Sequence, residues 1–182
     1  MARRTTTSSP KTSRPALLGP AFVGREAESA RLVAAISTPP AVVLLEGEAG
    51  IGKSRLVHEF LATELGNPEQ TLVMGCLPFR QPPTLGPVIE ALRQRPRGVT
   101  GLGLSNLAGA LRPFFPEWSD DLPPLPEPAE DATASRHRLF RALTELLDRQ
   151  EVTLLVLEDG HWADEATLEW LLYLTSRESP QV

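Results

Sequence analysis

The sequence predicts an α/β fold built around a parallel sheet, and three observations carry this prediction. Short, continuous apolar runs with branched side chains, typical of strands buried on both faces, occur at 41–46, 71–76 and 152–158. Segments with apolar residues at helical spacing separate these runs. With 182 residues and 41% hydrophobic composition, the chain can also bury the core of one ordinary domain. Strands that alternate with helices indicate a doubly wound sheet.

In the first half of the chain, the predicted elements follow the order helix, strand, helix, strand. Apolar residues recur at three- and four-residue spacing over 25–36, which predicts a helix that two consecutive prolines end. The apolar run 41–46 is predicted to be a strand, and a glycine-rich turn leads from it into a helix over 53–65. The run 71–76 is the second predicted strand.

The second half is expected to arrange helices around one further strand. The predicted elements are a short helix over 88–93, a weaker helix over 105–111, a strong helix over 135–149, a strand over 152–158 and a final helix. Prolines and acids crowd residues 113–131 and exclude a helix or an interior strand, so we expect an exposed loop or insertion there. Asp164 is suited to capping the final helix, whose apolar stripe is expected to be Leu168, Leu171 and Leu172.

The charge distribution separates a basic leader from an acidic body. The chain has a net charge of −5, although residues 1–20 carry only basic charges. Because this leader is rich in Ser and Thr and lacks the apolar core of a signal peptide, we expect it to be disordered, with an organellar transit peptide as the alternative. An acidic body gives no general attraction to DNA, so any DNA contact belongs to a domain outside this sequence. No apolar run suits a membrane span, and the single cysteine, Cys76, is interpreted as a small buried hydrophobe, so we expect a cytoplasmic protein.

A phosphate-binding motif stands between the first predicted strand and its helix. The stretch GEAGIGKS at 47–54 matches G-x-x-x-x-G-K-S in full. Glycines let such a loop wrap closely around phosphate oxygens, and the helix that follows adds unpaired N–H groups and partial positive charge. Lys53 is expected to reach the β and γ phosphates and Ser54 to coordinate magnesium, whereas the alternative is a turn that only joins a strand to a helix. The predicted nucleotide contacts here are Gly47, Glu48, Ala49, Gly50, Ile51, Gly52, Lys53, Ser54 and Arg55.

Two adjacent acids, Glu158 and Asp159, end the strand over 152–158. A phosphate-bound magnesium needs a second protein anchor, directly or through water, and an acid at the end of a neighbouring parallel strand is well placed to supply it. We therefore predict that Ser54, Glu158 and Asp159 hold the metal and that the two acids are the catalytic residues. The alternative is an ordinary polar strand end.

Three motifs in this order resemble one family: FVGREAE at 22–28, GEAGIGKSR at 47–55 and LLVLEDGHWAD at 154–164. They are similar to the origin-recognition-like AAA/STAND P-loop ATPase module at the N-terminus of large LuxR-type transcriptional regulators and of related signalling ATPases. The resemblance implies a three-layer P-loop NTPase sandwich. It also implies that Val23, Gly24 and Arg25 lie near the adenine and ribose; alternatively, Gly24 permits a turn and Arg25 is a solvated helix start.

One departure from the family pattern concerns Glu158, because the family usually begins its acid pair with Asp. Glu is longer by one methylene, so a metal or its water sits farther out if Glu158 takes the magnesium side. If Asp159 takes that side, the water-activating role stays open. We expect slow hydrolysis with intact nucleotide binding, since binding depends more on Lys53 and the backbone N–H groups than on the acids.

The resemblance further implies that residues 21–182 are the N-terminal part of an ATPase domain, because the sensor strand and the helical lid of the family have no counterpart here. The expected cofactors are ATP and Mg²⁺, and the expected partners are later domains of the same chain, with self-association on ATP binding. The leading hypothesis is a nucleotide-gated regulatory switch. The alternatives are an ATPase that drives DNA or protein remodelling, and the ATPase part of a cyclase- or kinase-linked signalling protein.

Overall fold

The structure, a computed structural model, describes residues 24–39, 41–62 and 68–177. The leader 1–20, Val23 and residues 63–65 of the second predicted helix lie outside the described residues. The α-helices are α1 (Glu26–Ile36), α2 (Lys53–Leu61), α3 (Gly86–Arg93), α4 (Ala132–Arg149) and α5 (Glu165–Arg177), and the strands are β1 (Thr71–Gly75) and β2 (Leu154–Glu158). Short 3-10 helices are η1 (Pro68–Gln70), η2 (Asn106–Leu111), η3 (Pro116–Trp118) and η4 (Gly160–Trp162).

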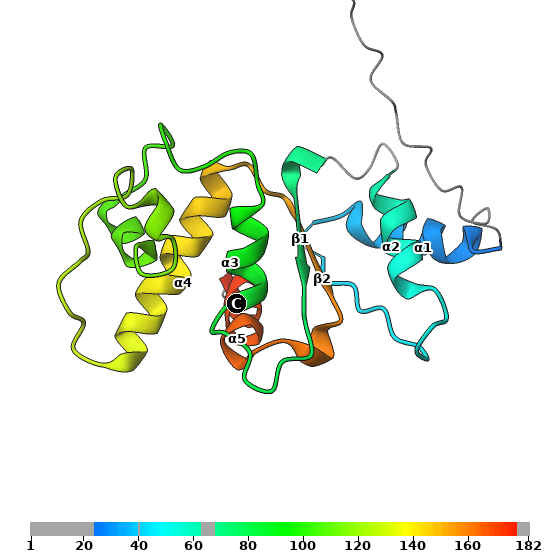
Figure 1. Cartoon of the computed structure of the whole chain (residues 1–182). Helices are drawn as coiled ribbons and strands as arrows, with labels where there is room; N and C mark the ends of the chain where they lie inside the picture. The colour runs from blue at the N-terminus through cyan, green and yellow to red at the C-terminus, as the bar shows by residue number, and fades with distance from the viewer. Residues whose placement is uncertain (1–23, 40, 63–67, 178–182) are drawn as a thin grey trace, which may run out of the picture.

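The two strands form a parallel pair at the centre of the molecule. Their register runs from Thr71 opposite Leu154 to Gly75 opposite Glu158. Helices α3, α4 and α5 lie on one side of the pair, and α1 and α2 lie on the other (Figure 1). The expected α/β fold with a parallel sheet is therefore confirmed, and both strands end at the same edge.

The first predicted strand, 41–46, is wrong, because the backbone there forms no strand. Val42 and Leu44 are each 78% exposed, and only Leu45 contributes to packing. Leu45 joins a small cluster that includes Leu56 of α2 and Leu32 of α1. A strand needs a neighbour for its N–H and C=O groups, and within the described residues the sheet consists of β1 and β2 alone.

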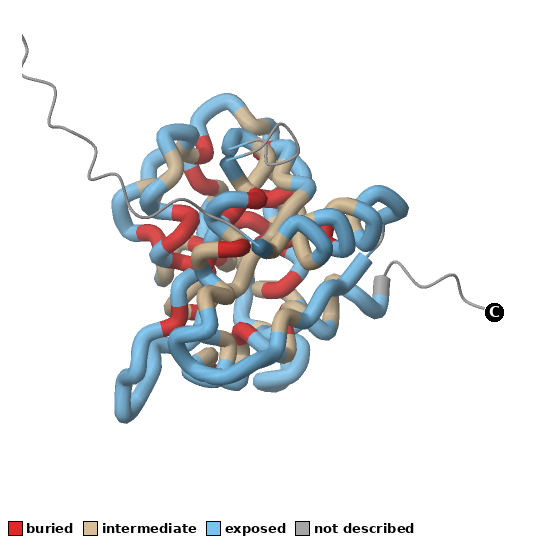
Figure 2. The backbone as a smooth tube through the Cα atoms, turned by 90° about the vertical axis from the view of Figure 1, so that its right-hand side faces the viewer, coloured by how far each residue is buried: buried red, intermediate tan, exposed pale blue. Residues whose placement is uncertain are grey.

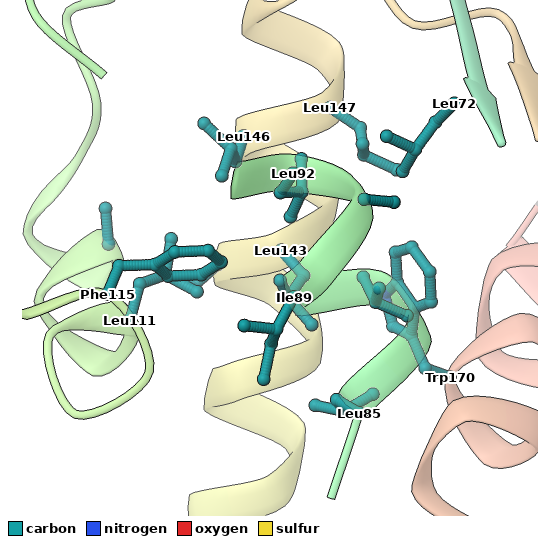
Figure 3. Packing of buried hydrophobic residues seen from close by; sticks show 14 of the residues in the cluster. Leu72, Leu85, Ile89, Leu92, Leu111, Phe115, Leu143, Leu146, Leu147 and Trp170 are labelled. Atoms are coloured by element: carbon teal, nitrogen blue, oxygen red, sulfur yellow. The ribbon is translucent and has the colours of Figure 1, made fainter. Parts of the chain in front are cut away.

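The main core lies between the sheet and helices α3, α4 and α5. Figure 3 shows Leu85, Ile89 and Leu92 of the α3 region against Leu143 and its neighbours on α4, with Leu72 of β1 above them. Buried stretches gather in the middle of the molecule and exposed ones surround them (Figure 2). Helix α4 starts three residues earlier than predicted because Asp131 caps it, accepting a 2.7 Å hydrogen bond from the Ala134 N–H. No helix among the described residues is long and apolar enough to span a membrane.

The proline- and acid-rich segment 113–131 is only partly the exposed loop that we expected. Phe115 is fully buried, Leu122 is 4% exposed, and Phe115 stacks on Trp118 with ring centroids 4.2 Å apart. Proline excludes an interior helical position but suits the first position of a 3-10 turn, which η3 uses at Pro116. The weaker helix predicted over 105–111 is likewise a 3-10 helix, η2.

Helix α5 buries only part of the predicted apolar stripe, because Leu171 packs against the main core but its two neighbours in the stripe are exposed. Asp164 caps the helix as expected, but Leu168 is 44% exposed and Leu172 is 69% exposed. Among residues 165–176 of the helix, Thr167 and Trp170 are fully buried. Burial of Trp170 removes more apolar surface from water than burial of one leucine. The observed orientation of α5, which places this largest side chain in the core, is therefore favoured.

Candidate functional site

The phosphate-motif loop leads into α2 at the edge where both strands end (Figure 1). Gly50 and Gly52 have φ angles of 79° and 95°, in the left-handed region that favours glycine. A Cβ atom on either residue would meet no heavy atom within 4 Å, so the backbone conformation, rather than lack of space, requires glycine. Gly52 is also the N-cap of α2, which places the unpaired N–H groups of that helix next to the loop.

Lys53 folds back over the loop that precedes it. Its Nζ donates hydrogen bonds to the carbonyl oxygens of Gly47, at 2.8 Å, and Glu48, at 2.9 Å. The Ile51 N–H also donates to the Glu48 carbonyl, at 3.4 Å. The ammonium group therefore lies within the curl of the loop, where its positive charge suits an anion.

Arg25 joins the start of α1 to the same loop. Its guanidinium donates a hydrogen bond to the Ile51 carbonyl, across 26 positions of sequence. Gly24 has a φ of 84°, and its N–H donates to Glu26 Oε1 at 3.2 Å, so this glycine forms the turn before the helix. Arg25 is therefore in contact with the loop, while the predicted base-side role of these residues stays a prediction.

The two predicted acids differ in their surroundings. The Glu158 side chain is 22% exposed, and its Oε1 lies 3.1 Å from His58 Nε2 of α2. This oxygen is buried, and the orientation of the imidazole does not make a hydrogen bond with it, so among the described residues it has no hydrogen-bond partner. Asp159 is exposed with a φ of 52°, and its carbonyl accepts a 2.9 Å hydrogen bond from the N–H of Trp162, the last residue of η4. Asp159 therefore has a clear role as a turn residue, and its role at a metal stays a prediction.

Sequence reasoning missed His58 because the residue has no metal-ligand spacing with another histidine. The sequence offered one signal: His58 follows Ser54 by four positions, and residues four apart lie on the same face of a helix. The structure brings Glu158 to this face of α2, one turn beyond Ser54.

The residues present fit a magnesium ion that is shared with phosphates. Within the described part of the chain, no group of three or more His, Cys, Asp or Glu side chains is arranged to hold a metal. Magnesium commonly takes one or two protein ligands and completes its shell with phosphate oxygens and water. Ser54, Glu158 and Asp159 carry oxygen ligands of this kind, and their joint binding of a metal stays a prediction. The buried Glu158 Oε1 lacks a hydrogen-bond partner among the described residues, so this carboxylate has acceptor capacity left for such a site.

Asp164 connects the loops that follow the two strands through hydrogen bonds. It is 7% exposed, and its Oδ1 accepts hydrogen bonds from the N–H groups of Leu85, at 2.9 Å, and Thr167, at 3.1 Å, while Oδ2 accepts from the Thr167 hydroxyl. Burial raises the pKa of the nearby Cys76 thiol, and the carboxylates of Asp164 and Asp159 raise it further. The 4% exposure of Cys76 confirms that it is a small buried hydrophobe.

The parallel sheet and the glycine-rich loop are compatible with a P-loop α/β protein. A family profile described as "AAA ATPase domain" matches residues 21–182, and the chain belongs to this family. It is also similar to an uncharacterized protein of Rhizobium meliloti (strain 1021), with 29% identity over 147 residues. That match covers 71% of this chain and 14% of the relative, so the chain spans a small part of the length of that protein. No solved structure gives a significant match. Family membership indicates a nucleotide-binding ATPase that uses ATP, typically with Mg²⁺.

Proposed function

We propose that this chain is the ATP·Mg²⁺-binding part of a nucleotide-dependent regulatory switch that hydrolyses ATP slowly. The observation that carries the proposal is the loop over 47–54: two glycines in left-handed conformations lead into α2, and the Lys53 ammonium lies within the curl. Membership of the AAA ATPase domain family supports the same reading.

In this proposal, the backbone N–H groups of the loop and of the first turn of α2 bind the phosphates. Lys53 exchanges its hydrogen bonds with the Gly47 and Glu48 carbonyls for phosphate oxygens, and Arg25 keeps the loop attached to α1 through Ile51. Ser54, Glu158 and Asp159 hold magnesium, which neutralises charge on the phosphates when it is bound. Slow hydrolysis is expected because Glu158 occupies the position where the family usually has Asp.

The switch role depends on later parts of a longer chain. Val42 and Leu44, which precede the phosphate-motif loop, and Leu168 and Leu172 on α5 leave apolar surface exposed. Together with the 14% coverage of the relative, this supports an N-terminal ATPase part, 21–182, whose sensor strand, lid and output domain belong to later residues. We propose a LuxR-type transcriptional regulator, in which such an output domain would make the DNA contacts.

Replacing Lys53 tests the nucleotide site. At a free ATP concentration one hundred times Kd, ligand binding should stabilise the folded protein by about 2.7 kcal/mol, and Lys53→Ala should lose this stabilisation. Thermal unfolding of the 182-residue chain with and without ATP·Mg²⁺ measures it. Arg141→Ala is the matched control, because it removes an exposed cation on α4. Equal ATP stabilisation of wild type and Lys53→Ala would refute the site.

The turnover rate tests the switch separately from binding. A switch should release phosphate slowly, and added DNA should not raise its turnover. Fast turnover that DNA or a protein partner stimulates would instead favour a remodelling ATPase. Phosphate release by wild type, with and without duplex DNA, distinguishes the two.

A further inference from the structure

His58 contacts the acid at the end of β2, although no motif of the sequence involves this histidine. Its Nε2 is 3.1 Å from Glu158 Oε1, and the two residues come from α2 and β2, one hundred positions apart in sequence. The imidazole is 63% exposed, whereas the carboxylate oxygen that it faces is buried. An exposed imidazole directed at a buried carboxylate oxygen contributes little to the core, so its contact with Glu158 is its main structural feature.

We propose that His58 is a positioning residue for Glu158 and holds its carboxylate ready to accept a hydrogen bond from a magnesium-bound water. This inference rests on the proposed function and deepens it, because it concerns the metal side of the same site. His58 touches neither the nucleotide nor the metal in this arrangement and acts through Glu158.

The spacing along α2 makes this role geometrically feasible. Four residues of helix advance about 6 Å along the axis, so a carboxylate in contact with His58 lies roughly 6 Å from Ser54 along α2. A chain from the Ser54 hydroxyl through magnesium and one of its waters to a carboxylate oxygen spans about 7 Å when extended and less when bent. Glu158 can therefore reach the metal's water shell while His58 still contacts it, and the extra methylene of Glu supplies the reach.

The chemistry of the two side chains supports the same role. A carboxylate has two oxygens with about four lone-pair sites, so contact between His58 and Oε1 leaves Oε2 for a metal-bound water. An unrestrained Glu side chain loses rotamer freedom when it is fixed, and a partner that orients it before the metal arrives reduces this entropic cost. Such partners behind metal-binding groups typically change metal affinity by about 10- to 100-fold when they are replaced.

A magnesium titration tests the proposal on the full 182-residue chain. The probe is a fluorescent N-methylanthraniloyl derivative of ATP, whose binding is measured first in EDTA and then with increasing Mg²⁺. His58→Ala should leave the affinity in EDTA unchanged and raise the Mg²⁺ concentration at half-saturation by about tenfold. His58→Gln keeps a polar side chain of similar length beside Oε1 and should recover most of the loss. His137→Ala is the matched control, because this exposed histidine lies on α4 and packs on Tyr173.

The outcomes separate this inference from the proposed function. If wild type fails to bind the probe, the nucleotide site itself is refuted, and the inference with it. If wild type binds and His58→Ala shows an unchanged or lower Mg²⁺ midpoint, the positioning role alone is refuted. Equal loss in the Ala and Gln variants would also refute it, because a polar side chain beside Oε1 would then be irrelevant. Unchanged thermal unfolding of the His58 variants shows that the effect is local.

Discussion

Replacing Asp164 should destabilise the fold more than the replacement of an ordinary helix cap. Its carboxylate caps α5 through the Thr167 N–H and accepts from the Thr167 hydroxyl. The same carboxylate accepts from the Leu85 N–H, a buried hydrogen bond across 79 positions of sequence. Leu85 has a φ of 56°, an uncommon conformation for leucine, and this hydrogen bond helps to hold it. Asp164→Ala therefore removes a cap and the tether between two loops.

The structure sets the expected size of this effect. Loss of an N-cap costs about 1 kcal/mol. Leaving the buried Leu85 N–H without an acceptor adds roughly 1–3 kcal/mol. We expect a total of about 3 kcal/mol for Asp164→Ala, which lowers the melting temperature by about 6–12 °C for a chain of this size. Asp164→Asn retains one carbonyl acceptor and should lose about 1 kcal/mol.

Asp131 provides the matched control for this measurement. It caps α4 with a single exposed hydrogen bond to the Ala134 N–H, so Asp131→Ala should cost about 1 kcal/mol. Urea unfolding of wild type and the three variants gives the free energies, provided that the slopes of the transitions agree. If Asp164→Ala costs no more than Asp131→Ala, the tether to Leu85 contributes nothing and the reasoning is wrong.

Two further predictions concern the core and the thiol. Trp170→Ala should lower the free energy of unfolding by about 3–5 kcal/mol, because the side chain is fully buried. Leu172→Ser, at a position 69% exposed, should change it by less than about 0.5 kcal/mol. Equal effects of the two variants in urea unfolding would contradict the burial of α5. Burial, then the Asp164 and Asp159 carboxylates, raise the pKa of Cys76 above its ordinary value of 9.0. In the unfolded chain the thiol ionises near pH 9.0, whereas in the folded chain it stays neutral to a higher pH. The stability that the neutral folded thiol contributes is therefore present below pH 9.0 and is lost as the pH rises through the raised pKa of the folded state. Wild type should therefore lose more stability than Cys76→Ala between about pH 8 and about pH 10, and parallel losses would refute the shift.

Most helices of this protein were predictable because local patterns determine them. The phosphate motif and the apolar spacing over 25–36 and 135–149 placed α1, α2 and α4 to within a few residues. Both strands that pair, 71–75 and 154–158, were also recognisable from continuous apolar runs. The error at 41–46 has a non-local cause: apolar composition favours a strand, but a strand needs a pairing partner, and within the described residues the sheet pairs only β1 with β2.

At the site, the sequence by itself determined which groups can bind phosphate, because a glycine-rich loop before a helix is a local feature. It also placed two acids at the end of a strand. Only the tertiary structure decided which groups meet. It placed Arg25 on the loop through Ile51, and His58 beside Glu158. Such contacts depend on how helices pack on the sheet, and spacing within one segment carries no information about a partner one hundred residues away.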